Sequence, residues 1–319
     1  MTKTPHPPSI WLGRLGALVL GGVLVVALVA KVLDPAAFAE QIEAEGLAGP
    51  LGARTVVFLA LALEAGLGAL LVLQVRRRWV LLPATALVGF FLFLTGRAYW
   101  WSMRGVLPEE MASCGCFGNL VERTPAEAFW QDLALLGVPL ALAFLGRSEA
   151  PRLPVRRLVV AGAFTVVTLA FAWQAPELPL DDVATRLRPG TEIASVCAGS
   201  EPRVCLPDVA PELLEGRHWV TIVDVDEAPE TWVEPLNERV WSGEDPPLTV
   251  LGSATQEQLM ELRFGHGPAF DVREAPAALL RPLHRSLPRS FLVEDGTVVL
   301  TSPGLPPHGG QGEEKNSGD

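Results

Sequence analysis

Long apolar runs alternate with short polar segments through the first 174 residues of the chain. A helix that spans a bilayer needs about 20 apolar residues, each rising 1.5 Å. Because backbone groups in lipid must find partners within their own segment, we expect these runs to be helices. The pattern predicts five spanning helices, at Leu15–Leu33, Thr55–Leu73, Trp79–Thr95, Phe129–Leu145 and Leu158–Trp173.

After Trp173 the pattern changes to that of a soluble α/β domain. Runs of β-branched residues predict buried strands, and apolar residues at helical spacing predict helices between them. Asp295-Gly296 separates two short strand-like runs, which indicates a hairpin. The predicted elements are a strand at His218–Asp224, a helix at Thr231–Trp241, a strand at Pro247–Leu251, a helix at Thr255–Arg263, and paired strands at Ser290–Glu294 and Thr297–Leu300. This order predicts helices packed on a sheet.

Composition and charge also divide the chain into two parts. Of its 319 residues, 49% are apolar and 19% are charged, and the net charge is −11. Residues 1–174 carry a net charge of +3, whereas residues 175–319 carry −14. The asymmetry indicates a body embedded in lipid joined to an acidic soluble domain. Nucleic acid is excluded as a partner, because phosphate binding relies on clustered Lys and Arg.

The arginine residues between the predicted helices indicate how the chain is oriented. Two connections are rich in arginine, one with Arg76, Arg77 and Arg78 and one with Arg147, Arg152, Arg156 and Arg157. Cytoplasmic loops carry an excess of basic residues, so both connections are expected inside the cell. With five spans, the loop before the fourth helix and everything after Trp173 then lie outside. All four cysteines are therefore expected in the compartment where disulfides persist.

These predictions divide the chain into six segments of a plasma-membrane protein. The first apolar run follows a short basic start, so a cleaved signal peptide is the alternative to a retained helix. The Gly-, Pro- and charge-rich end of the chain is typical of disorder. The segments are a cytoplasmic amino terminus (1–14), a four-helix membrane domain (15–146), a cytoplasmic loop with the fifth helix (147–174), a linker (175–190), an extracytoplasmic domain (191–301) and a disordered tail (302–319).

Two cysteines separated by one residue are the first candidate site. Cys114 and Cys116 stand in a Cys-Gly-Cys-Phe-Gly sequence before the fourth predicted helix. If they join, they close a small ring, and strained disulfides are the labile, oxidising ones. The amino-terminal dipole of the following helix would also favour the reactive thiolate. We predict a redox pair; permanent bonding and capture of a soft metal such as Cu(I) are the alternatives.

The other two cysteines flank a turn-rich stretch in the soluble domain. Cys197 and Cys205 could be brought together by a hairpin, which predicts a structural disulfide. A pair that exchanges with Cys114 and Cys116 is the alternative. Elsewhere, His266 has no recognisable second ligand, and no metal site is predicted.

Charged and aromatic residues in the apolar runs form a further candidate site. Glu64 lies in the middle of the second run, where an ionisable group is costly and should face a partner such as Lys31, Arg97 or Asp132. We therefore predict that Glu64 belongs to a proton site or a quinone-headgroup site. A polar contact between helices is the alternative. A second candidate quinone site consists of Arg97, Trp100 and Trp101 after the third run, where an interfacial aromatic belt is the alternative.

The soluble domain resembles the thioredoxin-like fold. Trp232-Val233-Glu234-Pro235 is similar to that family's first helix with its internal proline, and Pro288 stands where the family keeps a cis-proline. The family's Cys-x-x-Cys would then fall on Glu227-Ala228-Pro229-Glu230. Glutamate replaces both thiols, so thioredoxin's own exchange is excluded at this place.

The membrane half resembles MauE, the methylamine-utilisation membrane protein family of the DoxX-like group of four-helix proteins. The resemblance covers about residues 10–146 and rests on Lys31-x-x-Asp34-Pro35-x-x-Phe38, Leu63-Glu64 and the Cys114–Gly118 motif. It implies a role in making or maintaining disulfides in exported proteins. In the methylamine system the client is the disulfide-rich small subunit of methylamine dehydrogenase.

Together these features predict a membrane protein that supports thiol–disulfide exchange outside the cytoplasm, a candidate thiol–disulfide oxidoreductase. Cys114 and Cys116 would pass electrons to a quinone, and Glu64 would handle the proton. The expected partners are the lipid membrane and either an exported cysteine-containing client or a soluble thioredoxin-like protein. The alternative is a non-catalytic assembly factor or scaffold whose thioredoxin-like domain only recognises a client.

Overall fold

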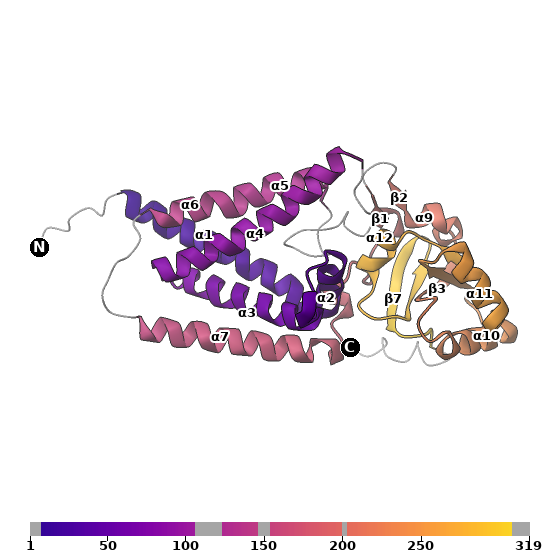
Figure 1. Cartoon of the computed structure of the whole chain (residues 1–319). Coiled ribbons are helices and arrows are strands. Elements are labelled where there is room, and N and C mark those ends of the chain that lie inside the picture. Colours follow the sequence, from indigo (N-terminus) through magenta and orange to yellow (C-terminus); the bar gives the residue numbers. More distant parts are fainter. Residues whose placement is uncertain (1–7, 106–122, 146–153, 200–202, 308–319) are drawn as a thin grey trace, which may run out of the picture. The chain divides into compact units, whose positions relative to one another are not determined.

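A computed structural model gives the fold of two compact units, Met1–Leu178 and Pro179–Asp319, called here the membrane unit and the second unit (Figure 1). The structure describes residues 8–105, 123–145, 154–199 and 203–307. Each unit is considered by itself below.

Five helices of the membrane unit are long and apolar enough to cross a bilayer, which confirms the predicted membrane domain. They are α1 (Pro8–Leu33), α3 (Ala53–Val72), α4 (Arg78–Met103), the run of α5 (Pro125–Asp132), η4 (Leu133–Gly137) and α6 (Val138–Phe144), and α7 (Val155–Gln174). Helix α4 continues beyond the predicted end at Thr95, so Arg97, Trp100 and Trp101 lie within it.

A further short helix, α2 (Pro35–Ala44), was not predicted from the apolar pattern. Its start is nevertheless encoded locally, because the Asp34 carboxylate accepts a hydrogen bond of 3.0 Å from the Ala37 N–H. Pro35 occupies the first turn, where its missing N–H costs nothing. Ile42 is buried and packs with Val57 of α3, which places α2 against the start of that helix.

Helix α1 packs closely against α3 and α6 because it has glycine at the contact points. A Cβ atom at Gly21 would lie 2.8 Å from the carbonyl oxygen of Gly68 on α3. One at Gly16 would lie 2.6 Å from the carbonyl oxygen of Pro139 on α6. Small residues allow such an approach between helices in a membrane. Between these contacts, Leu20 is fully buried in the core of the membrane unit.

The second unit is an α/β domain with a five-stranded mixed sheet in the order β5-β4-β3-β6-β7. Strand β3 pairs parallel with β4 and antiparallel with β6, and β6 and β7 form the predicted hairpin. The main elements are β3 (Arg217–Val223), α10 (Val233–Ser242), β4 (Leu248–Gly252), α11 (Gln256–His266), β5 (Val272–Glu274), β6 (Arg289–Glu294) and β7 (Thr297–Pro303). The strands and helices predicted between residues 218 and 300 are all present.

Alternating side chains of the central strand fill two cores. Val220 and Ile222 of β3 pack in one core with Phe291 of β6. Val223 packs in the other with Trp232 and other residues around α10. The Leu287–Pro288 peptide bond before β6 is cis, as the sequence led us to expect.

The segment between the last membrane helix and the sheet differs from the predicted linker at 175–190. The second unit begins at Pro179, and α8 (Asp181–Ala184) belongs to it. Arg289 of β6, which is 1% exposed, donates to the Thr185 hydroxyl at 2.9 Å and to the Leu187 carbonyl at 3.2 Å. Strand β7 also extends past the predicted domain end, to Pro303.

Replacing this arginine should therefore loosen the attachment of the segment that follows α8. In Arg289→Met the Thr185 and Leu187 oxygens lose their charged donor, which should cost about 2–3 kcal/mol of unfolding free energy. Hydrogen–deuterium exchange of β6 amides in the detergent-solubilised chain would measure the loss. The matched control is Arg263→Met, because the Arg263–Asp271 pair is largely exposed. It should change stability by less than about 0.5 kcal/mol, and equal effects of the two substitutions would contradict the assignment.

Candidate functional site

A buried ion pair joins α1 to α3 inside the membrane unit. The Lys31 Nζ donates to Glu64 Oε1, and the two side chains are 4% and 0% exposed. The same nitrogen lies 5.1 Å from the centre of the Phe38 ring and 4.9 Å from that of Phe91. An ammonium over an aromatic face is attracted by the ring quadrupole. Lys31 is thus contacted by side chains of α2, α3 and α4.

The pairing identifies Lys31 among the three partners that the sequence suggested for Glu64. Arg97 instead pairs with Glu45 at the end of α2, and the Arg97 guanidinium lies 4.9 Å from the centre of the Trp101 ring. Asp132 pairs with Arg123 at 3.1 Å. Glu64, Glu45 and Asp132 therefore each pair with a different basic side chain, as burial of a charge in lipid demands.

One oxygen of this cluster has no partner. Glu64 Oε2 is buried and makes no hydrogen bond with any residue that the structure describes. A buried carboxylate oxygen without a donor loses the stabilisation that water would give it. It is therefore suited to accepting a proton or a hydrogen bond from a bound molecule.

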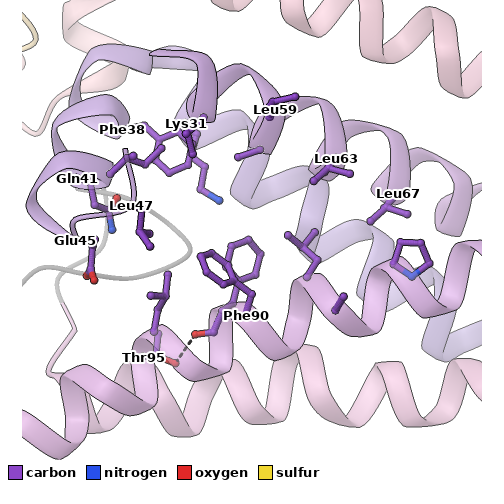
Figure 2. A pocket seen from close by; sticks show the side chains of 18 residues that line it. Lys31, Phe38, Gln41, Glu45, Leu47, Leu59, Leu63, Leu67, Phe90 and Thr95 are labelled. Carbon is purple, nitrogen blue, oxygen red and sulfur yellow. Dashed lines mark hydrogen bonds between the residues drawn. The ribbon is translucent and has the colours of Figure 1, made fainter. Parts of the chain in front are cut away.

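A cavity of about 590 Å³ adjoins the ion pair, between α2, α3 and α4 (Figure 2). Its lining is mostly apolar, and the polar groups are few. Figure 2 shows Lys31, Gln41 and Glu45 on the side formed by α2 and the end of α1, with Leu59, Leu63 and Leu67 of α3 along another wall. An apolar cavity of this size with a few converging polar groups is the usual form of a small-molecule site.

The predicted quinone site on α4 lies beside this cavity and is absent from its lining. Arg97 reaches the cavity only through its partner Glu45, which is a lining residue. Trp100 is 51% exposed and lies 4.4 Å from the Arg104 guanidinium. These contacts agree with an aromatic belt at the membrane surface.

The predicted redox pair, Cys114 and Cys116, lies outside the described residues. Helices α4 and α5, which flank this pair in the sequence, contact each other. Tyr99 of α4 and Phe129 of α5 stack with ring centres 5.8 Å apart. Helix α5 begins at a capping box, in which the Thr124 hydroxyl accepts from the Glu127 N–H at 3.2 Å.

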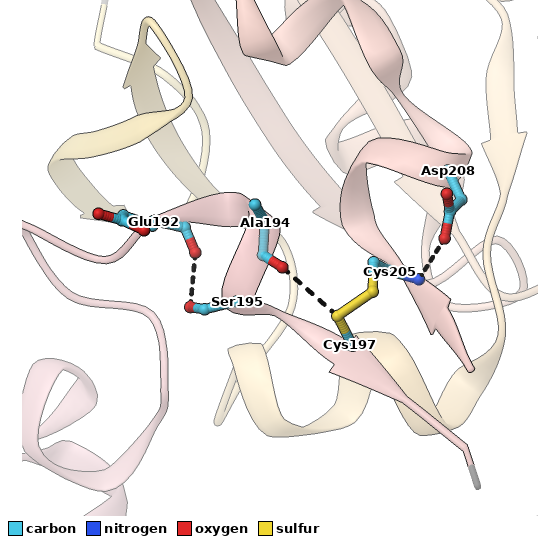
Figure 3. Close-up of a disulfide and its surroundings, with 6 residues drawn as sticks. All are labelled: Glu192, Ala194, Ser195, Cys197, Cys205 and Asp208. Atoms are coloured by element: carbon cyan, nitrogen blue, oxygen red, sulfur yellow. Dashed lines mark hydrogen bonds between the residues drawn. A yellow bond between two sulfur atoms is a disulfide. The ribbon is translucent and has the colours of Figure 1, made fainter.

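The second cysteine pair forms a disulfide, as the sequence predicted (Figure 3). Cys197 and Cys205 face each other in the two short antiparallel strands β1 (Cys197–Ala198) and β2 (Val204–Cys205). The Cys205 N–H donates to the Asp208 carboxylate at 2.7 Å, which begins helix α9 (Leu206–Val209) directly after the bond. The bond therefore has the surroundings of a structural disulfide that joins two neighbouring segments.

Sequence reasoning found Glu64 and missed the cavity next to it. Phe38, Gln41 and Glu45 belong to α2, and that helix was not predicted. Its signal is Asp34-Pro35, a capping residue followed by proline, which is typical of a helix start. Nothing in the sequence places the Phe91 ring beside Lys31, so its role in the site could not be predicted.

Comparison with known proteins finds a similarity for one part of the chain. Residues 9–146 match the family described as Methylamine utilisation protein MauE, which confirms the resemblance seen in the sequence. No curated protein and no solved structure matches the chain.

The ion pair predicts a characteristic pattern of mutational effects. Lys31→Met leaves the Glu64 carboxylate buried without a cation, which should cost about 3–5 kcal/mol. The double substitution Lys31→Met with Glu64→Leu removes both charges and should recover most of that loss. Thermal unfolding of the detergent-solubilised chain measures the difference. Equal destabilisation by the single and the double substitution would show that the charges are not coupled.

Proposed function

Because residues 9–146 carry a MauE-family domain, we propose that this multi-pass membrane protein serves methylamine utilisation by supporting disulfide formation in an exported protein. The observation that carries the proposal is the extent of the family match, which includes both Cys114 and Cys116. The five spanning helices put the chain in the lipid environment that this function requires.

The chemistry that we propose is a two-step exchange. In the first step a client dithiol reduces the Cys114–Cys116 disulfide, so that the client gains a disulfide and the pair becomes a dithiol. In the second step the dithiol passes two electrons and two protons to a membrane quinone, which becomes a quinol, and the pair returns to a disulfide. Glu64 takes part as a proton carrier, supported by its buried, unpartnered Oε2. A soluble thioredoxin-like protein could replace the client as electron donor.

The second unit, in this proposal, is a thioredoxin-like domain that presents the client. Its central β3, flanked by parallel β4 and antiparallel β6, supports the likeness, as does Pro235 in the helix that follows β3. At the place of the family's two thiols, Glu227 and Glu230 precede that helix. Glutamate has no exchange chemistry, so recognition is the role left to this unit.

A non-catalytic assembly factor is the second candidate. The observation that favours it is the Cys197–Cys205 disulfide, which lies within one small hairpin beside a capped helix, as a permanent bond would. In such a protein Cys114 and Cys116 would be permanently bonded as well.

Substitution of single cysteines separates the two functions. In the redox protein with Cys116→Ser, the Cys114 thiolate should attack the disulfide of an oxidised client, release one client thiolate and stay bonded to the other sulfur, because no second thiol is present to free it. Non-reducing electrophoresis followed by mass spectrometry would detect the adduct, and disulfide formation in the exported client should fall at least tenfold. The matched control, Cys197→Ser with Cys205→Ser, should trap nothing. If Cys116→Ser also traps nothing and keeps full activity, the assembly factor is favoured.

The orientation that we propose puts all four cysteines outside the cytoplasm. It is supported by the arginine residues at the starts of α4 and α7, where Arg77 and Arg78, and Arg156 and Arg157, lie at one end of each helix. A bulky maleimide that cannot cross lipid should label the reduced protein in intact cells. The matched controls are Arg77→Cys and Arg156→Cys in a chain whose four native cysteines are replaced by serine, and they should react only after lysis. The reverse labelling pattern would invert the orientation.

A further inference from the structure

The cavity between α2, α3 and α4 is open toward lipid. Leu59 and Leu63 of α3 and Phe90 of α4 line it, and each of these side chains is about half exposed on the surface of the bundle. On spanning helices such exposed apolar side chains face hydrocarbon. A molecule dissolved in the membrane can therefore enter the cavity sideways, past these exposed side chains of α3 and α4.

The charges around the cavity cancel. Glu64 neutralises Lys31, and Arg97 neutralises Glu45. The residues that the structure describes around the cavity leave no net positive charge to attract a phosphate, so the cavity is poorly suited to the headgroup of an anionic phospholipid. Its electrostatics favour a neutral molecule.

Hydrogen-bonding capacity nevertheless remains. The Lys31 ammonium has three N–H groups, and one of them is used by Glu64. The Gln41 side chain lines the cavity and has no hydrogen-bond partner among the described residues. Donors at the end of an apolar cavity match a ligand whose polar atoms are carbonyl oxygens.

Aromatic rings complete the lining. Phe38 of α2 and Phe91 of α4 lie beside the Lys31 ammonium, and Phe90 of α4 also lines the cavity (Figure 2). Rings of this kind pack well against another flat ring. A volume of about 590 Å³ can hold such a ring together with the first part of an apolar tail.

We propose that this cavity binds a quinone, a neutral ring with two carbonyl groups and an isoprenoid tail. Lys31 donates to one carbonyl, the ring lies against Phe91 and Phe38, and the tail leaves past Leu59 and Leu63 into the bilayer. The proposal rests on the function proposed above, which needs a membrane electron acceptor. Of the two quinone sites that the sequence suggested, it favours the neighbourhood of Glu64 over that of Arg97 and Trp100.

Binding can be tested without the redox step. The full chain carrying Cys114→Ser and Cys116→Ser is purified in detergent and photolabelled with an azido-quinone, and the labelled peptides are mapped by mass spectrometry. We expect label on α2 and α4, displaced by decylubiquinone and not by phosphatidylglycerol. Displacement by phosphatidylglycerol alone would assign the cavity to a phospholipid and overturn the proposal.

Variants that fill the cavity sharpen the test. Ala60→Phe and Ala86→Phe add a ring from opposite walls and should each reduce labelling at least tenfold. The matched control is Val166→Phe on α7, which is 66% exposed and lies outside the cavity. Gel filtration confirms that the variants fold. Equal labelling of all three variants would refute this site. Because these proteins lack both thiols, that outcome is independent of whether Cys114 and Cys116 exchange disulfides.

Discussion

An ammonium and a carboxylate buried together in an apolar bundle must meet, because either charge alone would be far too costly in lipid. In this protein that requirement fixes the end of α1 against the middle of α3 through Lys31 and Glu64. Phe38 and Phe91 then enclose the cation from α2 and α4. Four helices thus converge on one nitrogen atom, and the cavity is the space that their apolar side chains leave beside it. The candidate chemistry of the membrane unit depends on this convergence.

Much of the fold followed from the sequence, for reasons visible at particular residues. Apolar length alone revealed the five spanning helices, and the β-branched run around Val220 revealed the central strand of the sheet. Helix α2 was missed because its few apolar residues, such as Ile42, become meaningful only against Val57 of another helix. Strand β5 was missed because it has three residues and no apolar run. The attachment of Thr185 to Arg289 joins residues far apart in sequence, which no local pattern records.

The sequence predicts only those parts of the candidate site that follow from the energetic cost of burying a charged side chain in lipid. Glu64 needed a partner wherever it lay, but Lys31 could be chosen only once Arg97 and Asp132 were seen to have partners of their own. The Cys197–Cys205 bond could be predicted because both residues flank one short turn. The cavity could not be predicted from the sequence. Its walls come from four separate helices, and the sequence does not determine how each helix is rotated about its axis.

The close contact at Gly21 extends the influence of the charge pair along the whole length of α1. With only a hydrogen atom there, the helix rests directly on the backbone of α3 at Gly68. Any larger residue would act as a wedge at the middle of α1 and tilt the two helix axes apart. The tilt would be felt most at Lys31, about 15 Å farther along the helix. A position without a side chain therefore controls whether two distant side chains remain within reach of each other.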